Sequence, residues 1–398
     1  MSTIRMRDLL LGGAAGMLAG YAAWQAVRAL SVLRNPSPAG PKDARAYGRS
    51  RRRIAVASIV QTLAGSAVSA YGPLAERIDA ATCGVPVWLR PALLATSLSV
   101  ADTIAGLPGA YLDDYVLERR YGLTEQTSDA WLTEYLKGAA LSTGLTAVLA
   151  TLFGAVVRKA PRTWPAIAGA GTLPLFVLGN IVVPLYVMPL FNRFEPLEGP
   201  LEIRLRALAT SYGVGDADIL RMDMSKQTKK ANAFVTGIGS THRIVVGDTL
   251  LEHFTDDEIE FVVAHELGHY VAKDTWRLIG LGEALAFTVF LCANAMLPRG
   301  QREVLRDRPL LRARLLLWMQ VASQVLRPAL VAFSRSREWA ADRFALQATH
   351  APAVGARAFK RLRAQNLAED EQPAWYEFLF GSHPSLKARI EALDKSAL

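Results

Sequence analysis

The sequence is poor in cysteine and in charged residues. Only two of its 398 residues are cysteines, Cys83 and Cys292, and they lie far apart without a CxxC pattern. Neither a disulfide framework nor a thiolate metal site is therefore indicated. Charged residues make up 20% of the chain and apolar residues 51%, which excludes an ordinary soluble domain of this size. A membrane protein is the first expectation.

The apolar residues are gathered into seven blocks, each near the roughly 20 residues needed to cross a bilayer core. A single block could instead be a buried core helix, and the last block, which contains Arg327, is the weakest. The first block resembles a signal peptide, but it lacks a cleavage site and precedes a basic stretch, so we interpret it as a span. The blocks are Leu9 to Val27, Ile54 to Leu74, Pro91 to Leu112, Ala139 to Val157, Ala166 to Phe191, Leu278 to Leu297 and Leu315 to Phe333.

Basic residues give the chain a formal net charge of +9. A cluster of them, Lys42, Arg45, Arg49 and Arg51 to Arg53, lies between the first two blocks. The positive-inside rule explains this cluster as a cytoplasmic loop without invoking nucleic acid, so we expect no nucleic-acid partner. The segment Asn192 to Trp276 would then also be cytoplasmic. The arginines between Arg299 and Arg314 conflict with this orientation, because seven spans would place them outside.

Three charged residues, Asp102, Glu283 and Arg327, fall inside the predicted spans. A charge facing lipid costs at least about 2.5–3.5 kcal/mol at the bilayer centre, so these side chains must face protein or water. One interpretation pairs Arg327 with Glu283 or Asp102. The other places the charges around a hydrated chamber that admits substrate. The prolines of the fifth block, Pro165, Pro174, Pro184 and Pro189, predict a bent helix.

A segment with the composition of a globular unit follows the fifth block. "LEIRLRALATSYGVG" predicts a helix that ends near Gly213, and "DILRMDM" predicts a strand. "NAFVTGIGSTHRIVVGD" is typical of a β-hairpin. Thr255 and Glu258 form a capping-box pattern at the start of "FTDDEIEFVVAHELGHYVAKD", which predicts a helix through both histidines.

That helix carries an H-E-x-x-H pattern at His265, Glu266 and His269. At 3.6 residues per turn, the two histidines project from one face and both imidazoles can reach a single ion. Glu266 points about 100° away, where its carboxylate can address a metal-bound water. The alternative is a core helix that carries these residues by chance, but the chain has only six histidines. The pattern therefore favours a zinc peptidase site with one ion per chain.

A catalytic zinc ion needs a third protein ligand and an open position for water. Ala272 and Thr275 occupy the positions where the extended motif would have glycine and histidine, so the ligand must lie elsewhere. The best candidates are Glu338 and Asp342 in "FSRSREWAADRFA", which share a helical face. One would bind the metal and the other would orient a histidine. A solvated charge face is the alternative, and His242, His253, His350 and His383 are further candidates.

The chain resembles the membrane zinc metallopeptidase family of the type I CAAX prenyl protease. "HELGHY", followed by two spans and "SRSREWAAD", is similar to that family, as are five further stretches in the same order between about Asp113 and Leu393. The "ERRYGLTEQT" segment and the seven spans favour the prenyl-protease branch over the smaller heat-shock-type branch. The further stretches are "DDYVLERRYGLTEQTSDAWLTEYLK", "MPLFNRFEPLEGP", "ANAFVTG", "RIVVGDTLL" and "SHPSLKARIEAL".

The resemblance implies zinc held by His265, His269 and Glu338, Glu266 as general base, and Asp342 as the partner of a ligand. It also implies that Asn232 contacts the substrate backbone and that His383 and Arg389 lie near the developing oxyanion. The implied fold is an α-helical multi-spanning membrane protein in which seven helices surround a hydrated chamber. A mixed α+β zinc-peptidase unit would close its cytoplasmic end.

From these patterns we predict four segments. Residues 1–193 hold spans one to five, 194–275 the soluble insert, 276–333 spans six and seven, and 334–398 a helical segment that completes the zinc site. The predicted function is an integral-membrane zinc metalloendopeptidase that hydrolyses peptides or proteins, including ones with a prenylated C-terminus. The alternatives are a general membrane quality-control protease and a non-catalytic transporter or scaffold.

Overall fold

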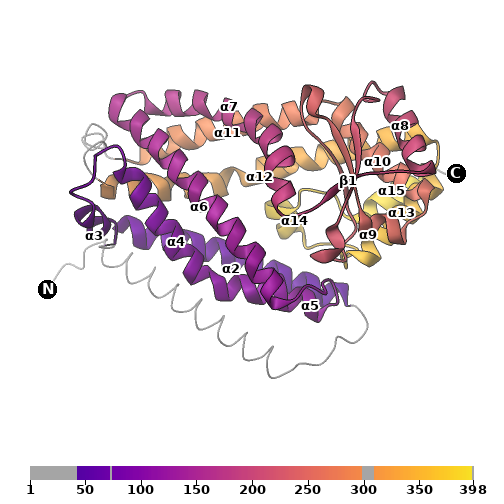
Figure 1. The fold of residues 1–398 in the computed structure, drawn as a ribbon, viewed down its shortest axis with the longest axis horizontal. Coiled ribbons are helices and arrows are strands. Elements are labelled where there is room, and N and C mark those ends of the chain that lie inside the picture. The colour runs from indigo at the N-terminus through magenta and orange to yellow at the C-terminus, as the bar shows by residue number, and fades with distance from the viewer. Residues whose placement is uncertain (1–42, 72–73, 298–308, 397–398) are drawn as a thin grey trace.

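The computed structural model describes residues 43–71, 74–297 and 309–396. Long helices fill one end of an elongated molecule, and a small sheet surrounded by shorter helices fills the other (Figure 1). The two ends share α12, which runs from Pro309 to Thr349 across most of the length of the molecule. This long helix therefore links the membrane part to the part that carries the H-E-x-x-H motif.

Six helical segments of the described residues are long and apolar enough to cross a membrane. They coincide with six of the seven predicted blocks, whereas the first block, Leu9 to Val27, lies outside the described residues. Little of their apolar surface is buried inside the protein, as expected for helices that face lipid. The helices are α2 (Ala44–Tyr71), α4 (Arg90–Ala110), α6 (Ser128–Lys159), α7 (Trp164–Val182), α11 (Asp274–Met296) and α12 (Pro309–Thr349).

Two of these helices change their winding next to prolines. Helix α4 contains Pro108 and continues as a π-helical turn, η1 (Tyr111–Val116), and then as α5 (Leu117–Arg120). Helix α7 continues as a second π-helical turn, η2 (Val183–Val187), which contains Pro184, and ends in the 3₁₀ turn η3 (Met188–Leu190). A proline removes one backbone donor, so the helical ladder changes at these points. The irregular winding agrees with the bend that the prolines of the fifth block predict.

The charged residues inside the spans do not pair with one another among the described contacts. Glu283 accepts a hydrogen bond of 2.5 Å from the hydroxyl of Thr172 on α7. The guanidinium of Arg327 lies 5.2 Å from the centre of the Phe380 ring. Asp102 is exposed on α4. The ion pairs considered from the sequence therefore do not account for these three charges.

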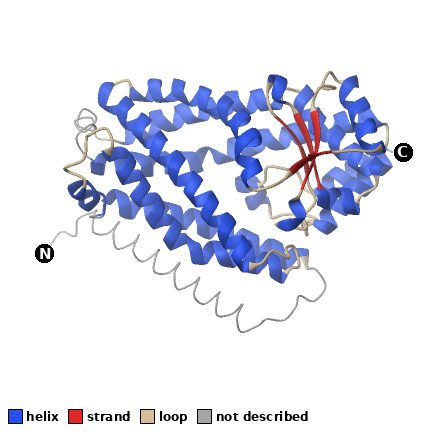
Figure 2. Ribbon diagram, in the orientation of Figure 1, coloured by secondary structure: helices blue, strands red, loops and turns tan. Residues whose placement is uncertain are grey.

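The sheet has four strands in the order β1-β2-β4-β3 (Figure 2). Strand β4 (Arg243–Gly247) pairs in parallel with β2 (Asp218–Met222) and antiparallel with β3 (Ala233–Thr236), which confirms the predicted hairpin. Strand β1 (Phe194–Pro196) pairs antiparallel with β2. Strand β3 therefore forms one edge of the sheet, and among the described residues no strand pairs with its outer side.

Short helices cover the sheet and enclose one hydrophobic core. Fully buried side chains of Leu205, Ile244, Leu250 and Phe261 meet in this core. The helices of this part are α8 (Pro200–Ser211), α9 (Asp248–His253), α10 (Asp256–Val271), α13 (Pro352–Gln365), α14 (Ala374–Phe380) and α15 (Leu386–Ser396). A further short helix, α3 (Leu74–Ala81), follows α2. Helix α10, which carries the H-E-x-x-H motif, is thus anchored inside a packed core rather than on the surface.

Side chains near the ends of two membrane helices join them to the sheet. Lys230, just before β3, donates a hydrogen bond of 2.8 Å to the hydroxyl of Tyr47 on α2. The ammonium of Lys230 also lies 2.8 Å from a carboxylate oxygen of Glu118 on α5, and Tyr47 donates to the same carboxylate. Glu118 and Tyr47 are buried, so this three-residue contact is shielded from water. It fixes the start of β3 against the membrane helices.

Helix α10 begins with the capping box that the sequence predicts. The hydroxyl of Thr255 accepts from the backbone N–H of Glu258 at 3.4 Å, and Glu258 Oε2 accepts from the N–H of Thr255 at 3.0 Å. Glu258 is fully buried, and its carboxylate lies 3.2 Å from the guanidinium of Arg361 on α13. One side chain thus caps α10 and connects it to α13.

We expect Glu258→Ala to lower the free energy of unfolding by about 1–3 kcal/mol, because the variant loses a helix cap and leaves buried donors unpaired. Glu258→Gln, which keeps the cap but not the charge, should fall between this variant and the wild type. The measurement is the midpoint of thermal unfolding in detergent. Glu252→Ala, which removes an exposed glutamate of α9, is the matched control. Equal midpoints for Glu258→Ala and Glu252→Ala would contradict the role of Glu258.

Candidate metal centre and active site

The site is formed where α10 crosses α12. A Cβ atom added to Gly268 of α10 would lie 3.1 Å from the Cα atom of Ala341 on α12, closer than side chains normally pack. Glycine and alanine therefore let the two helix backbones approach each other. On α10, His265 lies one turn before Gly268 and His269 follows it directly. On α12, Glu338 lies one turn before Ala341. The crossing brings these three side chains to one place although they are far apart in the sequence.

The three side chains surround a point that suits a metal ion. Nε2 of His265 lies 3.4 Å from Oε2 of Glu338, and Nε2 of His269 lies 3.4 Å from Oε1 of the same carboxylate. One ligand atom from each residue can be chosen so that all lie within 4.8 Å of one another. Tetrahedral ligands about 2.0–2.1 Å from zinc are themselves roughly 3.4 Å apart, which is longer than a normal hydrogen bond. The spacing is therefore that of ligands around an ion.

The carboxylate of Glu338 also has unused bonding capacity. Its Oε2 atom is buried and has no hydrogen-bond partner among the described residues. An unsatisfied buried oxygen is costly unless a cation or a donor reaches it. Nε2 of His265 lies 3.4 Å from it and Nη1 of Arg389 lies 3.5 Å from it. The orphaned oxygen, next to two imidazoles, fits a divalent cation.

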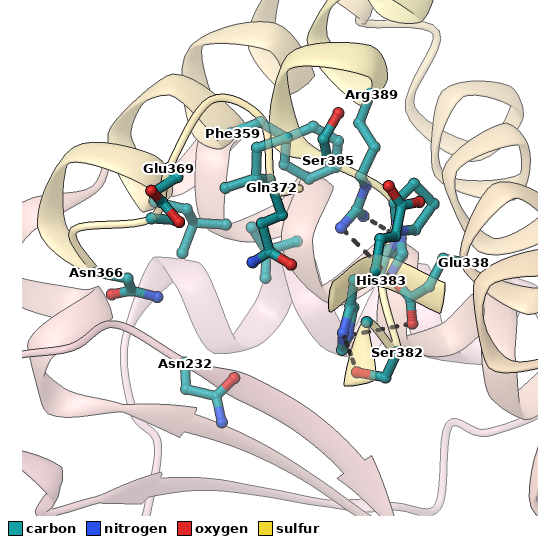
Figure 3. A pocket seen from close by; sticks show the side chains of 18 of the residues that line it. Asn232, Glu338, Phe359, Asn366, Glu369, Gln372, Ser382, His383, Ser385 and Arg389 are labelled. Carbon is teal, nitrogen blue, oxygen red and sulfur yellow. Dashed lines mark hydrogen bonds and ion pairs between the residues drawn. The ribbon is translucent and has the colours of Figure 1, made fainter. Parts of the chain in front are cut away.

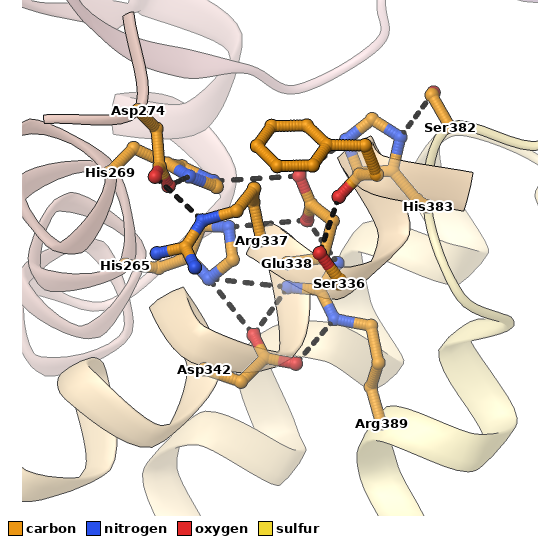
Figure 4. A network of polar contacts seen from close by, with 11 residues as sticks. His265, His269, Asp274, Ser336, Arg337, Glu338, Asp342, Ser382, His383 and Arg389 are labelled. Atoms are coloured by element: carbon orange, nitrogen blue, oxygen red, sulfur yellow. Dashed lines mark hydrogen bonds and ion pairs between the residues drawn. The ribbon is translucent and has the colours of Figure 1, made fainter. Parts of the chain in front are cut away.

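The outward nitrogen of each histidine faces an aspartate (Figure 4). Nδ1 of His265 lies 2.9 Å from Oδ1 of Asp342, and Nδ1 of His269 lies 3.0 Å from Oδ2 of Asp274. A carboxylate on Nδ1 holds the proton there and leaves Nε2 as the free lone pair. Both imidazoles are thus oriented with Nε2 toward Glu338.

An arginine in turn holds each aspartate. Arg389 donates from Nε to Oδ2 of Asp342 at 2.8 Å and from Nη2 to Oδ1 at 2.5 Å. Arg337 donates from Nε to Oδ1 of Asp274 at 2.6 Å. Both aspartates are buried, so the arginines compensate charges that would otherwise be costly to enclose. The two histidines therefore have parallel supports, His265–Asp342–Arg389 and His269–Asp274–Arg337.

The electrostatic environment favours positive charge at the centre. Burial lowers the pKa of His265, but the adjacent carboxylates of Asp342 and Glu338 outweigh burial and raise this pKa to about 9. The pKa of His269 is raised in the same way, because Glu338 and Asp274 outweigh its burial. The carboxylates thus attract a proton or another cation to the space between the imidazoles.

A cavity of about 440 Å³ opens onto these residues (Figure 3). Glu266, His265 and Glu338 line it, as does Asn232, which Figure 3 shows beside the sheet. Burial raises the pKa of Glu266, which makes its carboxylate a stronger base than an exposed glutamate. The cavity therefore places a basic carboxylate next to the candidate metal ligands.

His383 reaches the site from the loop between α14 and α15. Its Nε2 atom lies 3.3 Å from Oε1 of Glu338, and its Nδ1 atom lies 2.7 Å from the hydroxyl of Ser382. Burial lowers the pKa of His383, and the nearby guanidinium of Arg389 lowers it further against the opposing effect of Glu338. A neutral imidazole that accepts from Ser382 carries its proton on Nε2, the atom that faces the site.

Asn232 immediately precedes edge strand β3. Its backbone carbonyl accepts from the N–H of Gly247 at 3.0 Å, which keeps it in register with β4. The neighbouring Ala231 exchanges two hydrogen bonds with the side chain of Asn366, at 2.8 and 3.1 Å. These contacts fix the backbone, and the side chain of Asn232 is left at the cavity (Figure 3).

The structure thus brings together the site residues that the family resemblance implies: His265, Glu266, His269, Glu338, Asp342, His383 and Arg389 at the centre, and Asn232 at the edge of the cavity. His242 instead packs edge-on against Tyr270, with ring centres 4.6 Å apart. Asp274 and Arg337 also belong to the site, although the sequence patterns did not single them out. Asp274 follows His269 by five residues, so a carboxylate just beyond the motif was the available signal.

Two family models match nearly the whole chain. The model of peptidase family M48 matches residues 197–397, and the model described as "CAAX prenyl protease N-terminal, five membrane helices" matches residues 37–193. The first region contains strands β2, β3 and β4 of the sheet, α10 and the entire candidate site, and the second contains the first four described membrane helices.

Curated relatives are similar over most of their length. An uncharacterized metalloprotease, YhfN of Bacillus subtilis, is 29% identical over 75% of this chain and 72% of the relative. CAAX prenyl protease 1 of Saccharomyces cerevisiae is 26% identical over 75% of this chain and 70% of the relative. The crystal structure of S. mikatae Ste24p has the same fold, with a TM-score of 0.79 and 22% identity over 99% of this chain and 100% of that chain.

The M48 match extends over slightly more than half of the chain and includes both histidines, Glu266 and Glu338. The second match covers the membrane helices that precede it. The chain therefore belongs to peptidase family M48 and is a metalloprotease that crosses the membrane several times.

Proposed function

We propose that this protein is a zinc-dependent endopeptidase. The observation that carries the proposal is the pair of 3.4 Å separations between Glu338 and the Nε2 atoms of His265 and His269, which match the spacing of tetrahedral zinc ligands. Two imidazoles and one carboxylate are a ligand set of catalytic zinc. One ion per chain would occupy this position and leave a coordination site open.

Zinc bound there would polarise the scissile carbonyl and make water a nucleophile at neutral pH. Glu266 would then accept a proton from the attacking water and deliver it to the departing amine. Its raised pKa suits both steps, because a weakly basic carboxylate would be a poor proton acceptor. Glu266 lines the cavity beside His265, within reach of a substrate held there.

His383 is the better of the two groups considered for the oxyanion. It is exposed, it lines the cavity, and its Nε2 atom lies 3.3 Å from Oε1 of Glu338. The fork of Arg389 is occupied by Asp342, and its guanidinium also lies 4.2 Å from the ring centre of Phe359. We therefore assign oxyanion stabilisation to His383 and a positioning role, through Asp342, to Arg389.

A peptide would bind by adding a strand to β3. The outer edge of β3 is free, and main-chain hydrogen bonds would hold an extended substrate with little demand on its sequence. The Asn232 amide at the end of this edge could bond the substrate backbone close to the scissile bond. Such binding suits cleavage within a chain.

The substrates that fit best are peptides with a prenylated C-terminus. Several relatives bear the name CAAX prenyl protease 1, including those of Saccharomyces cerevisiae and Oryza sativa. A lipidated peptide end would lie in the membrane part of the protein, and the site adjoins the membrane helices through α12. The lipid bilayer would thus be a partner in substrate delivery.

We place the zinc site on the cytoplasmic side. The basic start of α2 contacts the peptidase part, since Arg52 pairs with Glu369 and the neighbouring Tyr47 contacts Lys230. Both therefore lie on the same side of the membrane. The positive-inside rule assigns the arginine cluster of α2 to the cytoplasm.

The four-segment division predicted from the sequence remains part of this proposal, although α12 continues past residue 333 as one helix.

We expect Glu338→Ala and Glu266→Ala to fail in different ways. Glu338→Ala should lose most of its zinc, because two imidazoles alone hold the ion weakly. Glu266→Ala should keep stoichiometric zinc and lose at least about 100-fold in kcat, since general base catalysis supplies that much. Zinc content by mass spectrometry and peptide hydrolysis are the two measurements. Equal zinc in Glu338→Ala and the wild type would rule out the ligand assignment.

Asp274→Asn should weaken zinc binding by about 10–100-fold, because the amide supports His269 less strongly than a carboxylate. The zinc affinity is measured by competition with a chelator of known affinity. Asp216→Asn, which changes an exposed aspartate in the loop before β2, is the control. If the affinity of Asp274→Asn equals that of Asp216→Asn, Asp274 has no role at the metal.

Two matched peptides that end in a CAAX sequence, one farnesylated and one not, test the substrate. We expect the purified wild type to cleave the farnesylated peptide at least about tenfold more efficiently, because burial of the lipid adds binding energy. Glu266→Ala is the control for contaminating proteases. Equal cleavage of both peptides would favour a general membrane protease, and zinc-loaded protein that cuts neither would contradict the proposal.

A further inference from the structure

A second cavity, of about 920 Å³, adjoins the catalytic cavity. It lies between the first turns of α2 and the segment from Arg363 to Pro373, with Lys387 of α15 at its border. Ala368, Glu369 and Gln372 line both cavities. The two cavities are therefore neighbours, with these three residues at their boundary, and the second one extends to the basic start of the first described membrane helix.

The charges of this second cavity do not balance. Each of its three carboxylates already has a cation: Glu369 pairs with Arg52, Asp370 with Arg363, and Glu371 with Lys387 at 2.7 Å. Arg45 and Arg49 also line the cavity.

These two arginines are one helical turn apart and exposed. Neither pairs with a carboxylate among the described residues. The cavity thus presents two guanidinium groups that remain available to an anion.

The direction of a bound peptide follows from strand β3. Antiparallel pairing is the more stable arrangement, and β3 runs from Ala233 to Thr236. A peptide added antiparallel to its free edge would enter beside Thr236 and leave beside Asn232. Beyond Asn232 lie Ala231 and Asn366, which are bonded to each other and line the catalytic cavity. The C-terminal side of the substrate would therefore approach the boundary at Glu369 and Gln372.

We propose that Arg45 and Arg49 form a subsite for the C-terminal carboxylate of the peptide substrate. The subsite would make the enzyme select bonds a short, fixed distance from a free C-terminus. An extended chain advances about 3.3 Å per residue, so the distance from the metal centre to the arginines sets how many residues are released. This inference rests on the proposed endopeptidase function and adds how the scissile bond is chosen.

The same two guanidinium groups could bind the phosphate of an anionic lipid, because α2 enters the membrane just after them. The substrate carboxylate is favoured by the geometry, since the cavity is adjacent to the catalytic cavity and shares three lining residues with it. A lipid site would need no such adjacency. The two sources of negative charge differ in their response to a change at the peptide terminus.

The test compares two peptides that differ only at the C-terminus, one a free carboxylate and the other an amide. We expect the wild type to prefer the carboxylate by about tenfold in kcat/KM, expressed mainly in KM, because the lost contact is a charge-assisted one. In Arg45→Gln/Arg49→Gln this preference should fall to about one. Arg53→Gln, an exposed arginine of α2 that lines neither cavity, should keep the preference.

Two outcomes would overturn the subsite. The first is an equal loss on both peptides in the double variant, with the carboxylate preference unchanged. The second is an effect of the double variant that appears only when phosphatidylglycerol vesicles replace neutral detergent, again without a change in preference, which would assign the arginines to lipid. Both assays use the zinc-loaded full chain.

A binding measurement separates this proposal from the proposed function. Fluorescence anisotropy gives the affinity of labelled carboxylate and amide peptides for Glu266→Ala, in which turnover is removed. A tenfold difference that disappears on adding the two arginine substitutions supports the subsite. Equal affinities contradict it, whether or not the wild type hydrolyses either peptide. Failure of the wild type to cleave both peptides would contradict only the endopeptidase function.

Discussion

The close crossing of α10 and α12 is the contact on which the candidate site depends. Gly268 and Ala341 keep the two backbones near enough for Glu338 to reach between two histidines that lie one turn apart. A larger residue at 268 would press on Ala341 and Phe344 of α12 and force a shift of a few tenths of an ångström at the crossing that positions Glu338. The helices are themselves anchored, α10 in the hydrophobic core and α12 among the membrane helices. The hydrophobic core around the sheet and the bundle of membrane helices thus meet at one candidate metal centre.

Charge compensation explains why so many ionisable groups are enclosed at this crossing. Two aspartates orient the histidines, and two arginines neutralise the aspartates, whereas Oε2 of Glu338 has no hydrogen-bond partner among the described residues. A divalent cation would complete the set. The membrane helices contribute a second fixed point, because Tyr47 and Glu118 hold Lys230 just before edge strand β3. The metal centre and the peptide-binding edge are consequently positioned by the same rigid frame.

Local sequence patterns predicted much of this arrangement. Six spans, the hairpin and the capped helix through His265 and His269 follow from hydrophobic periodicity and capping residues, which act over short distances. Family resemblance supplied Glu338 as the third ligand, since spacing alone could not choose between it and Asp342. Asp274 was missed because its contact with Nδ1 of His269 depends on how the two side chains are rotated, which sequence spacing does not show. Likewise, only the folded chain shows that Asp342 occupies the fork of Arg389.

The most direct test of the central claim is an anomalous difference map from crystals of the purified protein, recorded on both sides of the zinc absorption edge. The account predicts one peak per chain about 2.0–2.2 Å from the Nε2 atoms of His265 and His269 and from a carboxylate oxygen of Glu338. A peak bound through Nδ1, a peak at another cluster, or full zinc occupancy without contact to Glu338 would contradict it.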